Sequence, residues 1–158
     1  YMVKNREEAE DLVQEVYIRV MKSYDKFEGK SSEKTWLFSI AKNVAIDHFR
    51  KQRGWKERLY EKFDWDTQQV RDPSPLPEEK ALHNSELRSL YSCLDRCTTN
   101  QKLVIVLRFL NGLSIAETAE ALKWSESKVK TTQHRALKSL KTLMENMSRE
   151  EENGHASL

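Results

Sequence analysis

Residues 113–140 constrain the fold more than any other stretch of the chain, because their pattern fits two short helices around a tight turn. The first helix has a Ser-x-x-Glu capping box at Ser114 and Glu117, and Lys123–Ser125 forms the predicted turn. From position 123 to 144 there are six Lys or Arg residues and one acidic residue, Glu126. A helix-turn-helix places its second helix in the DNA major groove, so this one-sided positive charge predicts a DNA-binding motif.

The predicted second helix has one apolar face and one polar face. At about 100° per residue, its core stripe contains Val129, Ala136, Leu137, Leu140 and Leu143. A solvated amphipathic helix would have the same period, but the caps, the turn and the one-sided charge favour DNA contact. The candidate DNA-binding residues on the polar face and its flanks are Ser127, Lys128, Lys130, Thr131, His134, Arg135 and Lys138.

Composition favours an all-α fold and a cytoplasmic protein. The 158 residues include only four Gly and three Pro, which suits long helices better than a turn-rich β fold. The chain has no signal peptide, and no apolar run approaches the roughly 20 residues that a membrane span needs. Its two cysteines, Cys93 and Cys97, are too few for a disulfide framework, and we interpret them as buried, inert thiols.

The motifs that most often carry catalysis are missing from the sequence. There is no Gly-rich phosphate loop, no His-Glu-x-x-His motif and no Cys-x-x-Cys pair, and the four histidines are scattered. We therefore predict that the protein is not an enzyme, and that it uses no cofactor, no metal and no small-molecule substrate.

The periodicity predicts two small helical domains joined by a flexible linker. Helical patterns cover residues 5–24 and 33–52, whereas residues 54–80 have a poor period and contain all three prolines. The first helix has the apolar stripe Leu12, Val13, Val16, Tyr17, Val20, Met21 and Tyr24. We place the first domain at 1–55, the linker at 56–77, the second domain at 78–147 and a disordered tail at 148–158.

Charge is arranged in blocks along the chain, although the net charge is only +2. Residues 30–58 contain eight Lys or Arg and three acids, and residues 64–79 contain one Arg and five acids. Separate blocks suggest separate surfaces with separate partners. The segment Arg50–Lys56 mixes positive charge with an aromatic ring, so it either binds phosphate and unpaired bases or merely suits the negative end of a helix dipole.

Several motifs resemble one family of bacterial transcription factors. Asp11–Tyr17, Phe27–Gly29 and Thr35–Arg50 are together similar to region 2 of the extracytoplasmic-function group of sigma factors. Leu113–Leu140 resembles their region 4 helix-turn-helix, and Phe63–Thr67 makes the chain most similar to the sigma-X type. One helix-turn-helix would fit many regulators, but two different signatures in this order are specific.

The resemblance implies three sets of contacts. In the family, the first of these helices docks on the large subunit of RNA polymerase, which implies a polymerase-binding face at Asp11, Gln14, Glu15 and Arg19. The loop from Phe27 to Thr35 would hold a flipped base of the minus-ten element, with further contacts to that strand from Lys30, Ser31, Lys42, Asn43, Asp47, Arg50 and Lys51. Region 4 would read the minus-35 element through Lys130, Thr131, His134 and Arg135, while Ser127, Lys128 and Lys138 hold phosphates.

The implied partners are core RNA polymerase, promoter DNA and an anti-sigma factor. A stand-alone dimeric helix-turn-helix regulator and a module that titrates an inhibitor are the alternatives. In the family, region 2 starts with one more helix, and residues 1–4 are expected to be its last turn. A truncated chain, a start assigned at Met2 and a partly unstable domain are the open explanations.

Overall fold

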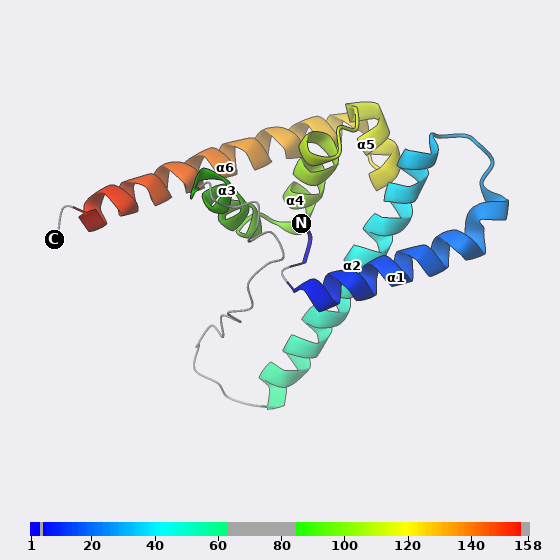
Figure 1. Cartoon of the computed structure of the whole chain (residues 1–158), viewed down its shortest axis with the longest axis horizontal. Coiled ribbons are helices and arrows are strands. Elements are labelled where there is room, and N and C mark those ends of the chain that lie inside the picture. Colours follow the sequence, from blue (N-terminus) through cyan, green and yellow to red (C-terminus); the bar gives the residue numbers. More distant parts are fainter. Residues whose placement is uncertain (4, 63–84, 156–158) are drawn as a thin grey trace. The chain divides into compact units, whose positions relative to one another are not determined.

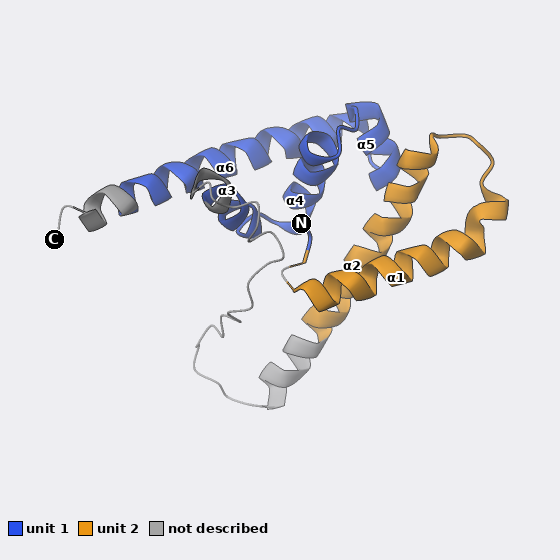
Figure 2. Cartoon of the chain, in the orientation of Figure 1, with its two compact units in different colours: residues 1–2, 77–158 blue, residues 3–76 orange. Residues whose placement is uncertain are grey.

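The computed structural model describes residues 1–3, 5–62 and 85–155, and all regular elements in these ranges are helices (Figure 1). The prediction of an all-α fold is confirmed. Contacts divide the chain into two compact units, which are Val3–Leu76 and the combination of Tyr1–Met2 with Pro77–Leu158 (Figure 2). The sequence motifs at Phe63–Thr67 and at the helix start near Pro77 lie outside the described residues.

The unit of residues 3–76 contains two long helices, α1 (Arg6–Ser23) and α2 (Glu33–Lys62). The Asn5 side chain accepts a hydrogen bond from the Glu7 amide at 2.8 Å and caps α1, as the acid-rich first turn suggests. A short 3₁₀ turn, η1 (Tyr24–Lys26), follows α1. The predicted last helical turn before α1 is not observed, because residues 1–3 are not helical.

Helix α2 continues ten residues beyond its predicted end at Gln52. The expectation that a linker starts at residue 56 is therefore wrong for residues 56–62. That expectation rested on the poor helical period and on the three prolines, which all lie beyond residue 62. Yet Lys, Arg, Glu and Leu have high helix propensity, and one glycine inside a helix costs only about 1 kcal/mol relative to alanine.

The apolar stripe predicted for α1 is only half covered. Leu12, Val16 and Val20 are partly buried, but Val13 and Tyr17 are 68% and 66% exposed. Helix α1 packs against the single helix α2, and one neighbouring helix covers only one side of such a wide stripe. The fully buried residues of this unit lie on α2 and include Thr35, Val44 and Ala45.

The other unit is built around α6 (Glu126–His155), against which α3 (Ser85–Asp95), α4 (Thr99–Ile105) and α5 (Ile115–Leu122) all pack. Its core contains Cys93, Leu94, Ile105, Val106, Ala136 and Leu140. Helix α6 extends to His155, so the predicted disordered tail is wrong for residues 148–155. The Arg and Glu residues of this stretch extend a helix without needing a core to pack against.

Local capping signals in this unit were predicted correctly. Both side-chain and backbone halves of the capping boxes are present at Thr98 with Gln101 and at Ser114 with Glu117. Between them, α4 continues as a π-helical segment, η3 (Val106–Leu110), and the chain leaves it through Gly112 at φ +70°. A left-handed residue at this point is the usual way to end a helix, and glycine adopts it without steric cost.

Candidate nucleic-acid interface

The start of α6 presents the seven predicted minus-35 residues on its open side. Ser127, Lys128, Lys130, Thr131, His134, Arg135 and Lys138 are all exposed. At about 100° per residue, these positions span roughly 160° of the helix circumference. The buried residues Val129, Ala136 and Leu140 lie on the opposite side. This arrangement lets one face of α6 enter a groove while the other remains in the core.

Leu137 corrects the predicted core stripe. Its side chain is 43% exposed. On the helix it lies about 60° to 100° from the buried residues and only about 20° from Lys130. An apolar side chain at this position can contact a thymine methyl group or a deoxyribose.

A tight turn fixes the direction in which α6 leaves α5. Lys123 adopts the left-handed conformation at φ 55°, and the Trp124 amide donates to the Ala119 carbonyl at 2.8 Å. The Ser125 hydroxyl accepts from the Lys128 amide at 3.2 Å and caps α6, as predicted. The Lys128 ammonium lies 4.2 Å from the centroid of the Trp124 ring. This cation–π contact holds the amine near the N-terminal end of α6.

Arg108 joins the π-helical segment to the helix-turn-helix. This link was not predicted from the sequence. Its Nε donates to the Gln133 side-chain oxygen at 2.9 Å, and its Nη1 donates to the Leu113 carbonyl at 2.5 Å. One guanidinium therefore ties α6 to the loop before α5. A signal was present in the sequence, because Arg108 is the one charged residue inside the apolar run 103–110.

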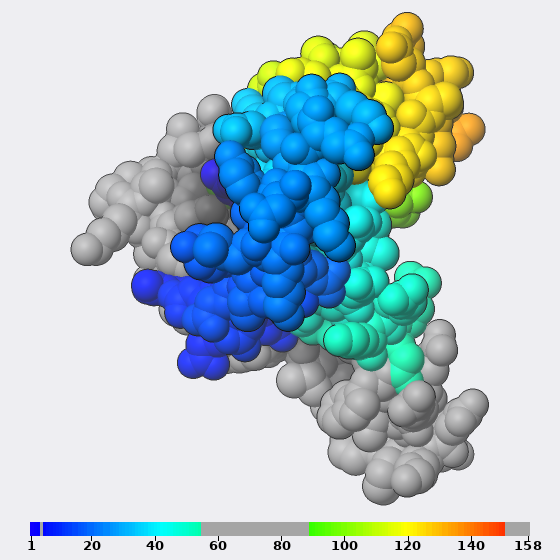
Figure 3. Space-filling view, turned by 90° about the vertical axis from the view of Figure 1, so that its right-hand side faces the viewer, coloured from blue at the N-terminus to red at the C-terminus, as the bar shows by residue number. Residues whose placement is uncertain are grey.

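The loop between α1 and α2 is organised by three aromatic rings. The Phe27 and Trp36 ring centroids are 5.0 Å apart, and Tyr24 meets Trp36 edge-on at 6.0 Å. The Ser32 hydroxyl accepts from the Thr35 amide at 3.1 Å and caps α2, as predicted. The space-filling view shows α1 and this loop, in blue, on the face turned towards the viewer (Figure 3).

The predicted minus-ten residues divide between this loop and α2. In the loop, Lys30 is exposed and forms an ion pair with Glu28, and Ser31 is half-buried. On α2, Asn43, Asp47, Arg50 and Lys51 fall within about 100° of the helix circumference. Of these four side chains, only Asp47 is not exposed.

Lys42 does not belong to this group. It lies about 100° away from Asn43 around α2, and only 9% of it is exposed. The family resemblance implies that Lys42 contacts the strand together with its neighbour Asn43. A buried lysine is not available to a DNA strand, so we exclude Lys42 from the strand-binding face.

The four predicted polymerase-binding residues lie on one side of α1. Asp11 and Gln14 are exposed, while Glu15 and Arg19 are half-buried. The Arg19 Nε donates to the Glu15 carboxylate at 2.7 Å. This hydrogen bond raises the pKa of the Arg19 guanidinium above its ordinary value, against the opposing effect of desolvation.

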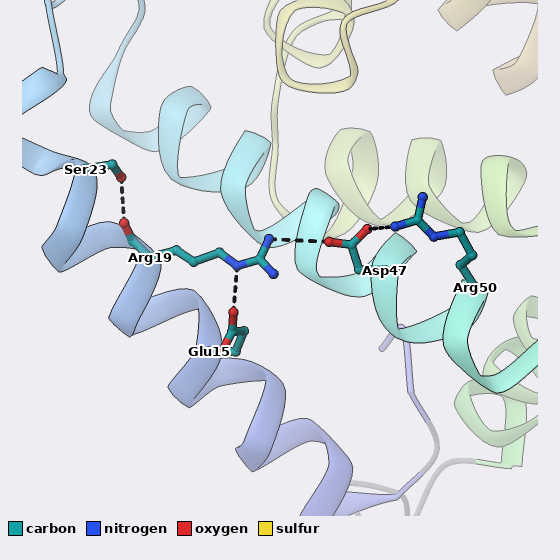
Figure 4. A network of polar contacts seen from close by, with 5 residues as sticks. All are labelled: Glu15, Arg19, Ser23, Asp47 and Arg50. Carbon is teal, nitrogen blue, oxygen red and sulfur yellow. Dashed lines mark hydrogen bonds and ion pairs between the residues drawn. The ribbon is translucent and has the colours of Figure 1, made fainter. Parts of the chain in front are cut away.

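Arg19 also reaches across to α2 and joins two predicted surfaces (Figure 4). Its Nη1 lies 3.5 Å from Oδ2 of Asp47, and Oδ1 of Asp47 accepts from Nη2 of Arg50 at 2.9 Å. A continuous row of four alternating charges therefore runs from Glu15 on α1 to Arg50 on α2. The family resemblance assigns the two ends of this row to different partners and does not predict the contact between them.

Metal-ligand clusters and membrane-spanning helices are two features that the described residues lack. Among them there is no cluster of three or more His, Cys, Asp or Glu that suits a metal ion. Within the same ranges, every helix is too short or too polar to cross a lipid bilayer.

Comparison with known proteins identifies both halves of the chain. The Sigma-70 region 2 family model matches residues 1–54, and the Sigma-70 region 4 model matches residues 87–140. The ECF RNA polymerase sigma factor SigX of Bacillus subtilis is 60% identical over 145 residues, which cover 92% of this chain and 75% of SigX. The RNA polymerase sigma factor YlaC of the same organism is 35% identical over 146 residues, covering 92% of this chain and 82% of YlaC.

Solved structures share the fold at lower sequence identity. The sigma factor RpoE from Bartonella quintana, solved with the anti-sigma factor NepR, has a TM-score of 0.68 and 23% identity, covering 91% of this chain and 85% of RpoE. CnrH, solved with the cytosolic domain of CnrY, has a TM-score of 0.63 and 24% identity, covering 92% of this chain and 76% of CnrH. From the two region models and the identity to SigX, the chain belongs to the extracytoplasmic-function sigma factors of the sigma-70 family, the proteins that direct RNA polymerase to promoters.

Proposed function

We propose that this sigma factor holds promoter DNA at two separate places, one for each helical unit. Region 4 reads the minus-35 element as a double strand, through Lys130, Thr131, His134 and Arg135, while Ser127, Lys128 and Lys138 contact phosphates. The observation that supports this assignment best is that all seven side chains are exposed opposite the buried face of α6. Arginine can bind guanine with two hydrogen bonds, and lysine binds phosphate without regard to sequence.

Region 2 holds the non-template strand of the minus-ten element in this proposal. The strand runs past Lys30 and Ser31 in the loop and along Asn43, Arg50 and Lys51 on α2. Exposed basic side chains beside aromatic rings are the combination that binds single strands. An unpaired base leaves the stack only when a polar pocket receives it, so region 2 assists strand opening by capturing that base.

The protein partners follow from the same proposal. Asp11, Gln14, Glu15 and Arg19 form the surface that docks on core RNA polymerase, and the chemistry of RNA synthesis belongs to the polymerase alone. Because promoters and polymerase are in the bacterial cytoplasm, the protein works there. RpoE was solved with the anti-sigma factor NepR, which supports an anti-sigma factor as the third partner of this chain.

Run-off transcription with purified core polymerase tests the proposal. The protein is added to core polymerase of its own organism together with a library of double-stranded promoter fragments. We expect transcripts only when both proteins are present, and only from fragments that share a minus-35 and a minus-ten motif. Absence of promoter-specific transcripts with an active core would contradict the proposal.

A stand-alone regulator would behave differently in two simple measurements. It would form a stable dimer in light scattering, and it would protect an operator from nuclease without polymerase. A sigma factor is expected to give a monomer mass and no footprint on free DNA at the same concentration, because each of its two DNA contacts is weak alone. A dimer with a footprint would favour the regulator.

A further inference from the structure

The four-residue charge row Glu15–Arg19–Asp47–Arg50 connects the proposed polymerase-binding and strand-binding surfaces. Glu15 and Arg19 stand one turn apart on α1, where the Ser23 hydroxyl also donates to the Arg19 carbonyl at 2.6 Å. Asp47 and Arg50 stand one turn apart on α2. Within this row, the step between the two helices is the 3.5 Å contact from Arg19 to Asp47, across 28 residues of sequence. Figure 4 shows that the row is continuous.

Asp47 differs chemically from its neighbours on the strand-binding face. Its carboxylate would repel a phosphate, whereas Asn43, Arg50 and Lys51 attract or donate to one. Both of its oxygens already accept from arginines, Oδ1 from Arg50 and Oδ2 from Arg19. A base amino group would have to share this carboxylate with the two arginines. A direct DNA contact therefore explains Asp47 poorly.

Stability of the fold does not explain the row either. The side chains of Arg19 and Asp47 are 39% and 34% exposed, and that of Arg50 is 78% exposed. Ion pairs with this much solvent contact contribute little to the free energy of unfolding. What such a pair can do is restrict orientation, since Arg50 otherwise has a long and flexible side chain.

We propose that Asp47 is a positioning residue, which holds the guanidinium of Arg50 for the promoter strand and links that orientation to Arg19 on the polymerase-binding face. The inference rests on the proposed function, because it takes Arg50 as a strand contact and Arg19 as a polymerase contact. The 3.5 Å contact is near the outer limit of a hydrogen bond, so docking of polymerase at Glu15 and Arg19 is able to strengthen or release it. Polymerase binding and strand capture are then coupled through one carboxylate.

If Asp47 acted only through its negative charge, the opposite change in DNA affinity would be expected. The direction of that change therefore distinguishes the two explanations. Asp47→Asn removes one negative charge next to DNA. If Asp47 acts only as a nearby charge, this change tightens DNA binding. If Asp47 positions Arg50, the same change weakens strand capture because the freed guanidinium must be ordered again on binding.

The test uses holoenzyme reconstituted from core polymerase and the full chain. The probe is a fluorescein-labelled single strand carrying the non-template minus-ten sequence of a promoter selected by the run-off assay. Its dissociation constant is measured by fluorescence anisotropy for wild type, Asp47→Asn, Asp47→Glu, Arg50→Ala, Arg19→Ala and the Asp47→Asn/Arg50→Ala double variant. Core affinity and the urea unfolding midpoint are measured for each variant in parallel.

If Asp47 positions Arg50, the single variants should bind the probe more weakly, and their losses should not add in the double variant. We expect Asp47→Asn and Arg19→Ala to raise the dissociation constant of the probe by about three- to fivefold, the range that exposed charge pairs support. The double variant should bind no more weakly than Arg50→Ala alone, and Asp47→Glu should recover part of the loss. Glu10→Gln is the matched control, since it removes a carboxylate of α1 that pairs with Arg6 on the same helix at 2.7 Å, and it should change nothing.

Three results would overturn the inference alone, and a fourth would overturn part of the proposed function as well. Unchanged or tighter probe binding by Asp47→Asn would make Asp47 a simple nearby charge. Additive losses in the double variant would make Asp47 and Arg50 independent. A lowered unfolding midpoint with an equal loss of core affinity would make the role purely structural. If Arg50→Ala itself binds the probe normally, the proposed strand contact of Arg50 fails as well.

Discussion

Arg135 and Lys128 lie on the same exposed side of α6 but offer DNA different chemistry. Arg135 presents a planar guanidinium with two parallel donors, which match the two acceptors of guanine in the major groove. Lys128 presents a point charge whose position is restricted by the Trp124 ring, 4.2 Å away. A planar donor specifies a base, whereas a point charge suits any phosphate.

Replacement of these two residues is expected to give different kinds of loss. Arg135→Ala should cost about 1–3 kcal/mol of binding free energy at one base position of the minus-35 element. Lys128→Ala should weaken binding to all sequences alike and reduce the slope of log affinity against log salt by about one unit. Both are measured with holoenzyme on promoter variants at several salt concentrations. Equal losses on every promoter variant from Arg135→Ala would refute its role as a base contact.

The two cysteines lead to a prediction about pH. Burial raises the pKa of the Cys93 thiol, and burial and the neighbouring Cys93 raise the pKa of Cys97. Folded thiols therefore stay protonated at a pH where unfolded thiols ionise. Their contribution to stability is complete below about pH 8.5 and is lost as the pH rises above it.

This loss can be measured by urea unfolding between pH 7 and pH 10. The free energy of unfolding should fall more steeply for the wild type than for a Cys93→Ala/Cys97→Ala variant. Native protein at neutral pH should also react slowly with iodoacetamide. Alkylation as fast in buffer as in urea would show that the thiols are accessible and would contradict this account.

At the scale of elements, helix ends with local signals were predictable and helix lengths were not. The caps at Asn5, Ser32 and Ser125 involve side chains within three residues of their partners, so a short sequence pattern determines them. The ends of α2 and α6 lie beyond the apolar stripes, where helix propensity alone decides. How much of the apolar stripe of α1 is buried depends on how many helices pack against α1. The helical period of the sequence does not contain that information.

Replacing either of two glycines with alanine should change the free energy of unfolding, but in opposite directions. No atom lies within 4 Å of a Cβ added at Gly54 or at Gly112, so neither change causes a clash. Gly54 is inside α2, where alanine should raise the free energy of unfolding by about 0.5–1 kcal/mol. Gly112 has φ +70°, where alanine should lower it by about 1 kcal/mol.

Urea unfolding followed by circular dichroism measures both glycine variants against wild type. Arg108→Leu tests the segment after η3 independently, because it removes the bridge from Arg108 to Leu113 and Gln133. It should lower the free energy of unfolding by about 1–3 kcal/mol. A stabilising effect of Gly112→Ala would contradict the left-handed conformation of this residue.

At the scale of the whole molecule, the division into two helical units and the family were accessible from sequence, and the joining contacts were not. The seven exposed residues of α6 follow from a period of 3.6, because one buried stripe fixes where the rest must lie. Lys42 and Asp47 lie on the same helix as the exposed residues Asn43, Arg50 and Lys51. Their burial and pairing depend on α1 and on other tertiary contacts, which the sequence of α2 alone does not contain.

The central claim is that two separate surfaces of one sigma factor read two separate promoter elements. The most direct test sequences the run-off transcripts that holoenzyme makes from a randomised promoter library, with wild type, Arg135→Ala and Asn43→Ala in parallel. We predict that Arg135→Ala changes base preference only within the minus-35 element and that Asn43→Ala changes it only within the minus-ten element. A change of preference in both elements from either variant, or in neither element from both variants, would contradict the claim.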